Sequence, residues 1–233
     1  MIQQHNCWYI SSHIREMSKV FYENPVIEQI FKEFYKNENK QDKDKLLNLV
    51  ERLPPKDVNT KIFGKTVLIC ACGFSYIEVV KLLLEKEGID VNVQNKYGST
   101  ALILASWNDH IEIVKLLLEK DDINVNIQNY GRNTALMFAS WNDHIEIVKL
   151  LLEKDGIDVN TRDSTGNTTL MLASINGHTE IVKLLLEKEN IDVNMQCSGG
   201  ITALTYASIY NHIEIYKLLE NYQKNWFIIS KVA

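Results

Sequence analysis

The chain has 233 residues, of which 45% are hydrophobic and 24% are charged, and its formal net charge is −5. This balance supplies enough apolar side chains for a sizeable core, so intrinsic disorder is excluded as the main state. Acidic and basic residues are interleaved and do not form blocks. The charge pattern therefore predicts neither a surface for nucleic acid nor one for an anionic membrane.

The ends and the cysteines of the chain indicate a soluble protein. Residues 1–6 lack the basic stretch and following apolar stretch of a signal peptide, and no apolar run approaches the roughly 18 residues that span a bilayer. The four cysteines have the spacing neither of a disulfide framework nor of a zinc set. We therefore expect reduced thiols and a cytoplasmic location.

Residues 1–40 predict an N-terminal helical segment with two apolar stripes. The stripes consist of Ile10, Ile14, Met17 and Phe21, and of Ile27, Ile30, Phe31 and Phe34. Asn24 followed by Pro25 is typical of the start of a helix. We expect the segment from Ile10 to Tyr35 to pack on the domain that follows, because apolar stripes are usually covered. Its alternative role is a helical hairpin that recruits a partner.

A second, shorter helix is predicted just after a polar linker. The segment from Asp44 to Leu53 has the apolar spacing of a helix, and Pro54 and Pro55 end it.

A period of 34 residues governs most of the remaining chain. Threonines recur at this spacing, and so do histidines and the glutamates two positions after them. The three series are Thr66, Thr100, Thr134, Thr168 and Thr202; His110, His144, His178 and His212; and Glu112, Glu146, Glu180 and Glu214. The stretch from Ala105 to Asp121 recurs unchanged at Ala139 to Asp155. Such self-similarity indicates a repeat array.

Each unit predicts two short helices and a turn. In one unit a small, apolar segment from Ala101 to Ser106 is followed by a polar break at residues 108–110. The segment from Ile111 to Lys120 then carries apolar residues at helical spacing. Neither helix is long enough to be stable alone in water, so we expect the units to stack into a solenoid.

Residues 223–233 predict an apolar C-terminal tail that follows the last helix and contains Trp226, Phe227, Ile228 and Ile229. We expect this tail to fold back over the open end of the array. The alternatives are a docking peptide and self-association, although a monomer is the expected state.

These residues resemble the ankyrin repeat, whose pattern is D-x-x-G-x-T-P-L-H-x-A, then G-H-x-E-I-V-x-L-L-L, then D-V-N. In the second unit the matching positions are Asn95, Gly98, Thr100, Leu102, Ala105, His110, Glu112, Ile113, Val114, Leu116, Leu117, Val125 and Asn126. The resemblance covers roughly residues 57–222. It implies an all-α solenoid of five 34-residue repeats over residues 60–222, preceded by a degenerate N-terminal capping unit over residues 41–59 and the helical segment over residues 1–40.

The sequence departs from the family pattern in three ways, and one of them is that apolar residues or threonine replace the histidine of T-P-L-H. Alanine, threonine or valine replaces the proline of T-P-L-H, which we expect to lower the stability of each unit. Arg132 occupies the place of the turn glycine in the third unit, directly after Gly131. We expect that hairpin to be reshaped.

The resemblance implies that a partner meets the hairpin tips and the exposed part of each first helix. Carried over one by one, the candidate positions are Phe63, Phe74, Lys96, Tyr97, Trp107, Asn108, Tyr130, Trp141, Asn142, Ile175, Asn176, Ile209 and Tyr210. Aromatic residues beside asparagine and serine are typical of protein-binding hot spots. The alternative is that Trp107 and Trp141 wedge between neighbouring helices as packing.

The sequence predicts no catalytic, cofactor-binding or metal site. It contains no Gly-rich phosphate loop, Ser-His-Asp set or HExxH motif. Histidines of successive stacked units would lie about 8–10 Å apart, too far to share one metal ion. We expect these histidines to hydrogen-bond to neighbouring backbone.

The predicted function is a non-catalytic adaptor, scaffold or inhibitor that binds a protein partner, with no nucleic-acid or membrane partner. Its location would be the host-cell cytoplasm if the source is a virus or an intracellular bacterium. One alternative is a two-site recruiter, such as a ligase adaptor or a host-directed effector, that uses the N-terminal helices or the C-terminal tail. The other is a structural array without a selected partner.

Overall fold

The structure is a computed structural model that describes residues 25–36 and 42–232, with side chains described as far as Lys224. Within these residues the regular elements are helices, and the only β-type pairing is two isolated bridges. The all-α prediction is therefore confirmed. The chain divides into two compact units, Met1–Asp90 and Val91–Ala233, and each is described by itself. The apolar stripe from Ile10 to Phe21 lies outside the described residues.

The first unit contains two described helix pairs. Its elements are α2 (Pro25–Phe34), α3 (Lys43–Glu51), the 3₁₀ helix η2 (Pro55–Asp57), α4 (Val67–Gly73) and α5 (Ile77–Leu84). Helix α2 packs on α3 and α4, and α3 packs on α5. The pair α2–α3 therefore forms a layer on the pair α4–α5.

Helix α2 is held in this layer by an aromatic contact. The second predicted stripe, Ile27, Ile30, Phe31 and Phe34, is at most 1% exposed. The ring of Phe34 lies 5.5 Å from that of Tyr76 and 6.1 Å from that of Phe74, measured between centroids. The expectation that this stripe packs on the following domain is confirmed for residues 25–34.

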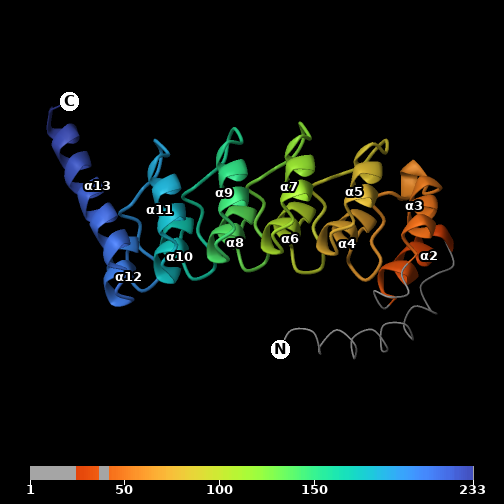
Figure 1. Cartoon of the computed structure of the whole chain (residues 1–233), viewed down its shortest axis with the longest axis horizontal. Coiled ribbons are helices and arrows are strands. Elements are labelled where there is room, and N and C mark those ends of the chain that lie inside the picture. Colours follow the sequence, from red (N-terminus) through yellow and green to blue (C-terminus); the bar gives the residue numbers. More distant parts are fainter. Residues whose placement is uncertain (1–24, 37–41, 233) are drawn as a thin grey trace. The chain divides into compact units, whose positions relative to one another are not determined.

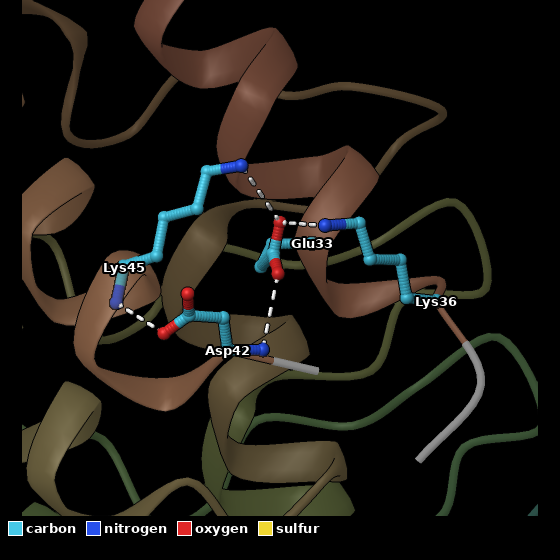
Figure 2. Close-up of polar contacts among 4 residues, drawn as sticks. All are labelled: Glu33, Lys36, Asp42 and Lys45. Carbon is cyan, nitrogen blue, oxygen red and sulfur yellow. Dashed lines mark hydrogen bonds and ion pairs between the residues drawn. The ribbon is translucent and has the colours of Figure 1, made fainter. Parts of the chain in front are cut away.

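A buried carboxylate joins α2 to α3 (Figure 2). The side chain of Glu33 is 2% exposed, and Lys36 donates to its Oε2 at 2.6 Å while the backbone N–H of Asp42 donates to Oε1 at 3.1 Å. Lys45 Nζ lies 3.7 Å from Oε2. Burial alone would raise the pKa of this carboxyl, but the hydrogen bonds from Lys36 and Asp42 and the charges of Lys36 and Lys45 outweigh it and lower the pKa.

The boundary that the sequence suggested at residue 40 falls between α2 and α3, which pack on each other. The residues on its two sides, in α2 and α3, share one apolar core and the ion pairs of Glu33. Helix α2 lacks the threonine and alanine pattern of the other first helices and packs through larger side chains.

The second unit consists of four successive helix pairs (Figure 1). They are α6 (Ala101–Trp107) and α7 (Ile111–Leu118), α8 (Ala135–Trp141) and α9 (Ile145–Leu152), α10 (Thr169–Asn176) and α11 (Thr179–Leu186), and α12 (Ala203–Ile209) and α13 (Ile213–Val232). First helices stack in the order α6, α8, α10, α12, and second helices in the order α7, α9, α11, α13. This stacking confirms the predicted solenoid within the unit.

The repeated threonine starts each first helix. Thr134 has an extended backbone, and its Oγ1 accepts from the N–H of Met137 at 3.3 Å, as an N-cap should. Just after the helix, a residue with a left-handed backbone turns the chain into the second helix: Asp143 with φ 60° after α8 and Gly177 with φ 77° after α10. Apolar side chains such as Ile147 and Val148 are then fully buried.

Three series of polar side chains fix the register between neighbouring pairs. Asn126 Nδ2 donates to Gly156 O at 2.7 Å, while its Oδ1 accepts from Asp158 N at 2.9 Å. Asn92 and Asn160 make the equivalent bonds. Gln128 Nε2 donates within its own hairpin to Arg132 O and across to Arg162 O. The histidines, described below, form the third series.

Two expectations are wrong. The hairpin at Arg132 is not reshaped: Arg132 adopts φ 59°, close to the φ 78° of Gly98, and its N–H donates to Asn129 O at 2.8 Å as that of Gly98 does to Asn95 O at 3.0 Å. The same hydrogen bond as in the hairpin of Gly98 thus holds the arginine in a backbone conformation that favours glycine.

The second wrong expectation concerns the C-terminal tail. Residues 223–232 belong to the last helix, because α13 runs without a break from Ile213 to Val232. Nothing between those residues is proline or glycine, so no local signal ends the helix.

Candidate binding surface

Four hairpins of the second unit form a continuous backbone platform. Each hairpin is bonded to the next: Tyr130 N donates to Tyr97 O, Ser164 N to Gly131 O, and Ser198 N to Thr165 O, each at 3.0 Å. Within the first hairpin, Asn95 Oδ1 accepts from Tyr97 N at 2.8 Å and Ser99 N at 3.0 Å. The tips are therefore held in place before any partner arrives.

Large aromatic side chains stand on this platform and on the first helices. Tyr97 is 54% exposed, Tyr130 77%, Trp107 51% and Trp141 47%. Gly98 makes room for one of them, because a Cβ at this position would lie 2.7 Å from the ring of Tyr130. We call Tyr97, Trp107, Tyr130, Phe138 and Trp141 together the aromatic face.

Trp107 packs on the next helix pair and is also exposed. Its ring lies 4.4 Å from that of Phe138 in the next pair, tilted by 51°, and about half of its surface remains exposed. Packing therefore fixes one side of the indole, and the other side stays accessible. A side chain fixed in this way loses little conformational entropy when a partner binds.

The asparagines among the candidates have a structural role as well. Asn108 Nδ2 donates to Leu104 O at 2.9 Å, Asn142 Nδ2 to Phe138 O at 3.1 Å, and Asn176 Nδ2 to Leu172 O at 2.9 Å. In each case the amide satisfies a carbonyl at the end of the first helix.

The last pair offers a smaller apolar area. Ile209 is 59% exposed and Tyr210 is 53% exposed, whereas Ile175 in the preceding pair is partly buried. The rings of Tyr206 and Tyr210 stack with their centroids 6.4 Å apart. The hydroxyl of Tyr206 lies 3.5 Å from the thiol of Cys197, and this hydrogen bond, with burial, raises the pKa of Tyr206 to about 12.

Two candidates belong to the first unit. Phe74 is 45% exposed, but its ring stacks on that of Phe34 and meets that of Tyr35 edge-on, with 6.1 Å between centroids in both cases. Phe63 is partly buried and has a left-handed backbone with φ 53°. Both are therefore described apart from the aromatic face, whose residues all lie in the unit Val91–Ala233.

The histidines of the last three units bond to neighbouring backbone, as predicted. His144 Nε2 lies 3.1 Å from Trp107 O, His178 Nε2 3.1 Å from Trp141 O, and His212 Nε2 3.0 Å from Ile175 O. Each imidazole thus anchors the end of the preceding first helix. In the part of the chain that the structure describes, no three His, Cys, Asp or Glu side chains gather as a metal-binding group.

Sequence reasoning missed three residues of this surface. Phe138 stands where Leu104 and Leu172 stand in the adjacent units, and that aromatic substitution was a readable signal. Arg132 and Arg162 are exposed at the hairpins. Their signal was a positive charge at hairpin positions that otherwise carry small or polar residues.

Comparisons with known proteins agree with the repeated geometry. A family model described as ankyrin repeats in three copies matches residues 36–129 and 156–226. A second, described as ankyrin repeats in many copies, matches residues 116–170. No curated protein matches the chain. Within the described residues, no helix is both long enough and apolar enough to cross a membrane.

Proposed function

The chain belongs to the ankyrin-repeat family, and from this premise we propose that it binds a protein partner through the aromatic face of the unit Val91–Ala233. Ankyrin repeats generally mediate protein–protein interaction and are generally not catalytic. The proposal adds the surface: the hairpin tips and first helices, with Trp107 and Trp141 as central anchors.

One observation carries the proposal. Four large aromatic side chains remain between 47% and 77% exposed on a framework whose neighbouring hairpins and helices are bonded to one another. Exposed aromatic residues of this size are unusual on a soluble surface unless they are used. Rigid aromatic side chains with mixed polar neighbours are the residues that contribute most to protein binding.

We propose the role of an adaptor, scaffold or inhibitor that works as a monomer in the cytoplasm. The two-site recruiter is less well supported, because Ile27, Ile30, Phe31 and Phe34 are buried against the first unit and offer no docking stripe. A purely structural array has no observation in its favour beyond the packing that every repeat protein needs.

The test is affinity capture from extracts of the source organism or its host. The wild-type chain is compared with Trp107→Ala/Trp141→Ala and with Glu146→Ala/Lys149→Ala, a matched control on the exposed side of α9. Circular dichroism melts verify that all three proteins are folded. We expect specific partners to be lost from the tryptophan variant and retained by the control.

If the tryptophan variant retains every partner that the wild type captures, the aromatic face is not the binding surface. If the wild type captures no specific partner while remaining folded, the structural-array interpretation replaces the proposal.

A further inference from the structure

Charge is distributed unevenly over the second unit. The first helices α6, α8, α10 and α12 contain no charged residue. The second helices α7, α9 and α11 each carry one glutamate and one lysine. The loops that leave them are rich in acid, as at Asp121, Asp122, Asp155 and Asp158, all of which are exposed.

The hairpins, in contrast, present positive charge. Lys96, Arg132 and Arg162 are exposed and belong to three successive repeats. Lys96 Nζ lies 5.1 Å from the centroid of the Tyr97 ring, and Arg162 Nη2 donates to Gln196 O at 2.8 Å. The three cations stand at different positions of the 34-residue unit, so they do not form a regular row. Hydrogen bonds between neighbouring hairpins nevertheless place them on one continuous platform.

The single acid in the four hairpins does not cancel these cations at the surface. Asp163 is 9% exposed, and its Oδ1 accepts from Thr165 N at 2.8 Å, Thr165 Oγ1 at 2.7 Å and Asn167 N at 2.8 Å. Its charge is therefore directed into the turn. The border of the aromatic face at the tips is positive, on a chain whose net charge is −5.

We propose that the partner docks through an acidic protein segment, with its carboxylates at Lys96, Arg132 and Arg162 and its apolar side chains on the aromatic face. This inference rests on the proposed function and names the chemistry of the partner. Arginine binds a carboxylate with two parallel hydrogen bonds, which fixes orientation as well as attraction. The acidic loops behind the second helices repel the same segment, so long-range attraction favours the aromatic face.

Single-stranded nucleic acid is the competing occupant, since it also uses cations and aromatic stacking. Two exposed carboxylates at the opposite border of the aromatic face disfavour nucleic acid. Asp109 and Asp143 follow the two tryptophans by two residues, and their side chains are 51% and 50% exposed. A phosphate backbone lying over Trp107 and Trp141 would meet these carboxylates.

The test is selection from a displayed library of random peptides. The full chain is the target, and the selected peptides are then measured against two variants. Lys96→Glu/Arg132→Glu/Arg162→Glu reverses the charge of the tips, and Trp107→Ala/Trp141→Ala removes the anchors. Circular dichroism is used to verify that both variants are folded.

We expect the selected peptides to be enriched in Asp and Glu beside apolar residues and to bind the charge-reversed variant about tenfold more weakly. The same library panned on that variant should instead yield peptides rich in Lys and Arg.

The outcomes separate the two proposals. Peptides that need the tryptophans but are neutral or basic would overturn the acidic segment and leave the proposed function standing. A library that yields no tryptophan-dependent peptide would overturn both. Displacement of the selected peptides by oligo(dT), with direct binding of oligo(dT) to the chain, would replace the protein segment by a nucleic acid.

Discussion

The pairs α2–α3 and α8–α9 belong to different units and are held by different forces. In the second unit, Asn126, Gln128 and His144 bond to the adjacent repeats, and the same bonds recur at each period. In the first unit, α2 is fixed by large apolar side chains and by Glu33. In the repeated pairs, many equivalent hydrogen bonds thus fix the register. The divergent pair α2–α3 depends instead on a few large apolar side chains and one buried carboxylate.

The same comparison separates two uses of aromatic residues. Phe31 and Phe34 in α2 are at most 1% exposed, whereas Trp107 and Trp141 are about half exposed. The phenylalanine rings of α2 are therefore fully covered, whereas the indole rings of α6 and α8 are only partly covered. Partial exposure in α6 and α8 accompanies a surface that also carries the hairpin cations, which supports a binding role for it.

The largest expected effect is the loss of an aromatic side chain from the divergent pair. Phe34→Ala removes a fully buried ring that touches Phe74 and Tyr76, so we expect the free energy of unfolding of the first unit to fall by about 3–5 kcal/mol. Trp141→Ala, at a half-exposed ring, should cost less than about 2 kcal/mol. Urea unfolding followed by circular dichroism compares them, and equal losses would remove the distinction between the two pairs.

Glu33→Gln should cost about 1–2 kcal/mol, a reduced value because Lys36 and Lys45 are 39% and 51% exposed. The folded state lowers the pKa of Glu33, so its contribution is complete above the ordinary pKa of 4.5 and is lost as the pH falls through the lower, folded-state pKa. Urea midpoints measured from neutral to acid pH should converge for the two proteins. A difference that persists at the acid end would show that the charge is not the cause.

Two substitutions with smaller expected effects test the cost of the left-handed backbone conformation in the hairpins. Arg132→Gly should stabilise the second unit by about 0.5–1 kcal/mol, because glycine adopts the left-handed conformation without the cost of a Cβ. Gly98→Ala at the equivalent position should destabilise, since its Cβ meets Tyr130. Thermal melts measure both, and a loss of stability in Arg132→Gly would indicate that the arginine side chain contributes more than its backbone costs.

The smallest effect concerns a buried hydroxyl that recurs in the array. Ser140 Oγ is buried without a hydrogen-bond partner, whereas Ser208 at the equivalent position of the last pair is exposed. Ser140→Ala should therefore be neutral or stabilising by a few tenths of a kcal/mol, up to about 1 kcal/mol, and Ser208→Ala should have no effect. The melting temperatures of the two variants and the wild type measure these changes in stability. A clear loss in Ser140→Ala would mean that the hydroxyl has a partner.

Sequence reasoning predicted the fold wherever the signal was repeated. The 34-residue period located both helices of each unit, and the spacing of the histidines indicated their backbone bonds. Sequence reasoning also predicted that the stripe from Ile27 to Phe34 packs on the following domain, but not the ring contacts of Phe34 with Phe74 and Tyr76, which only the folded structure displays.

The candidate surface was predicted in part. Tyr97, Trp107, Tyr130 and Trp141 were recognised from their positions in the repeat and are exposed. The contact of Trp107 with Phe138 was not, because it joins adjacent units and depends on side-chain direction. The helical continuation of residues 223–232 was also missed, since an apolar composition alone does not distinguish a tail from a longer helix.

The central claim is that the aromatic face is where a partner binds, and site-specific photo-crosslinking tests it most directly. A benzophenone amino acid is placed at Tyr130, which is 77% exposed and leaves both tryptophans in place, or, as the control, at Lys149 on α9. Each protein is irradiated in extract of the source or host cells. We predict that position 130 crosslinks to the partner captured by the wild-type chain and that position 149 does not. Crosslinking to that partner at position 149 but not at position 130 would contradict the account.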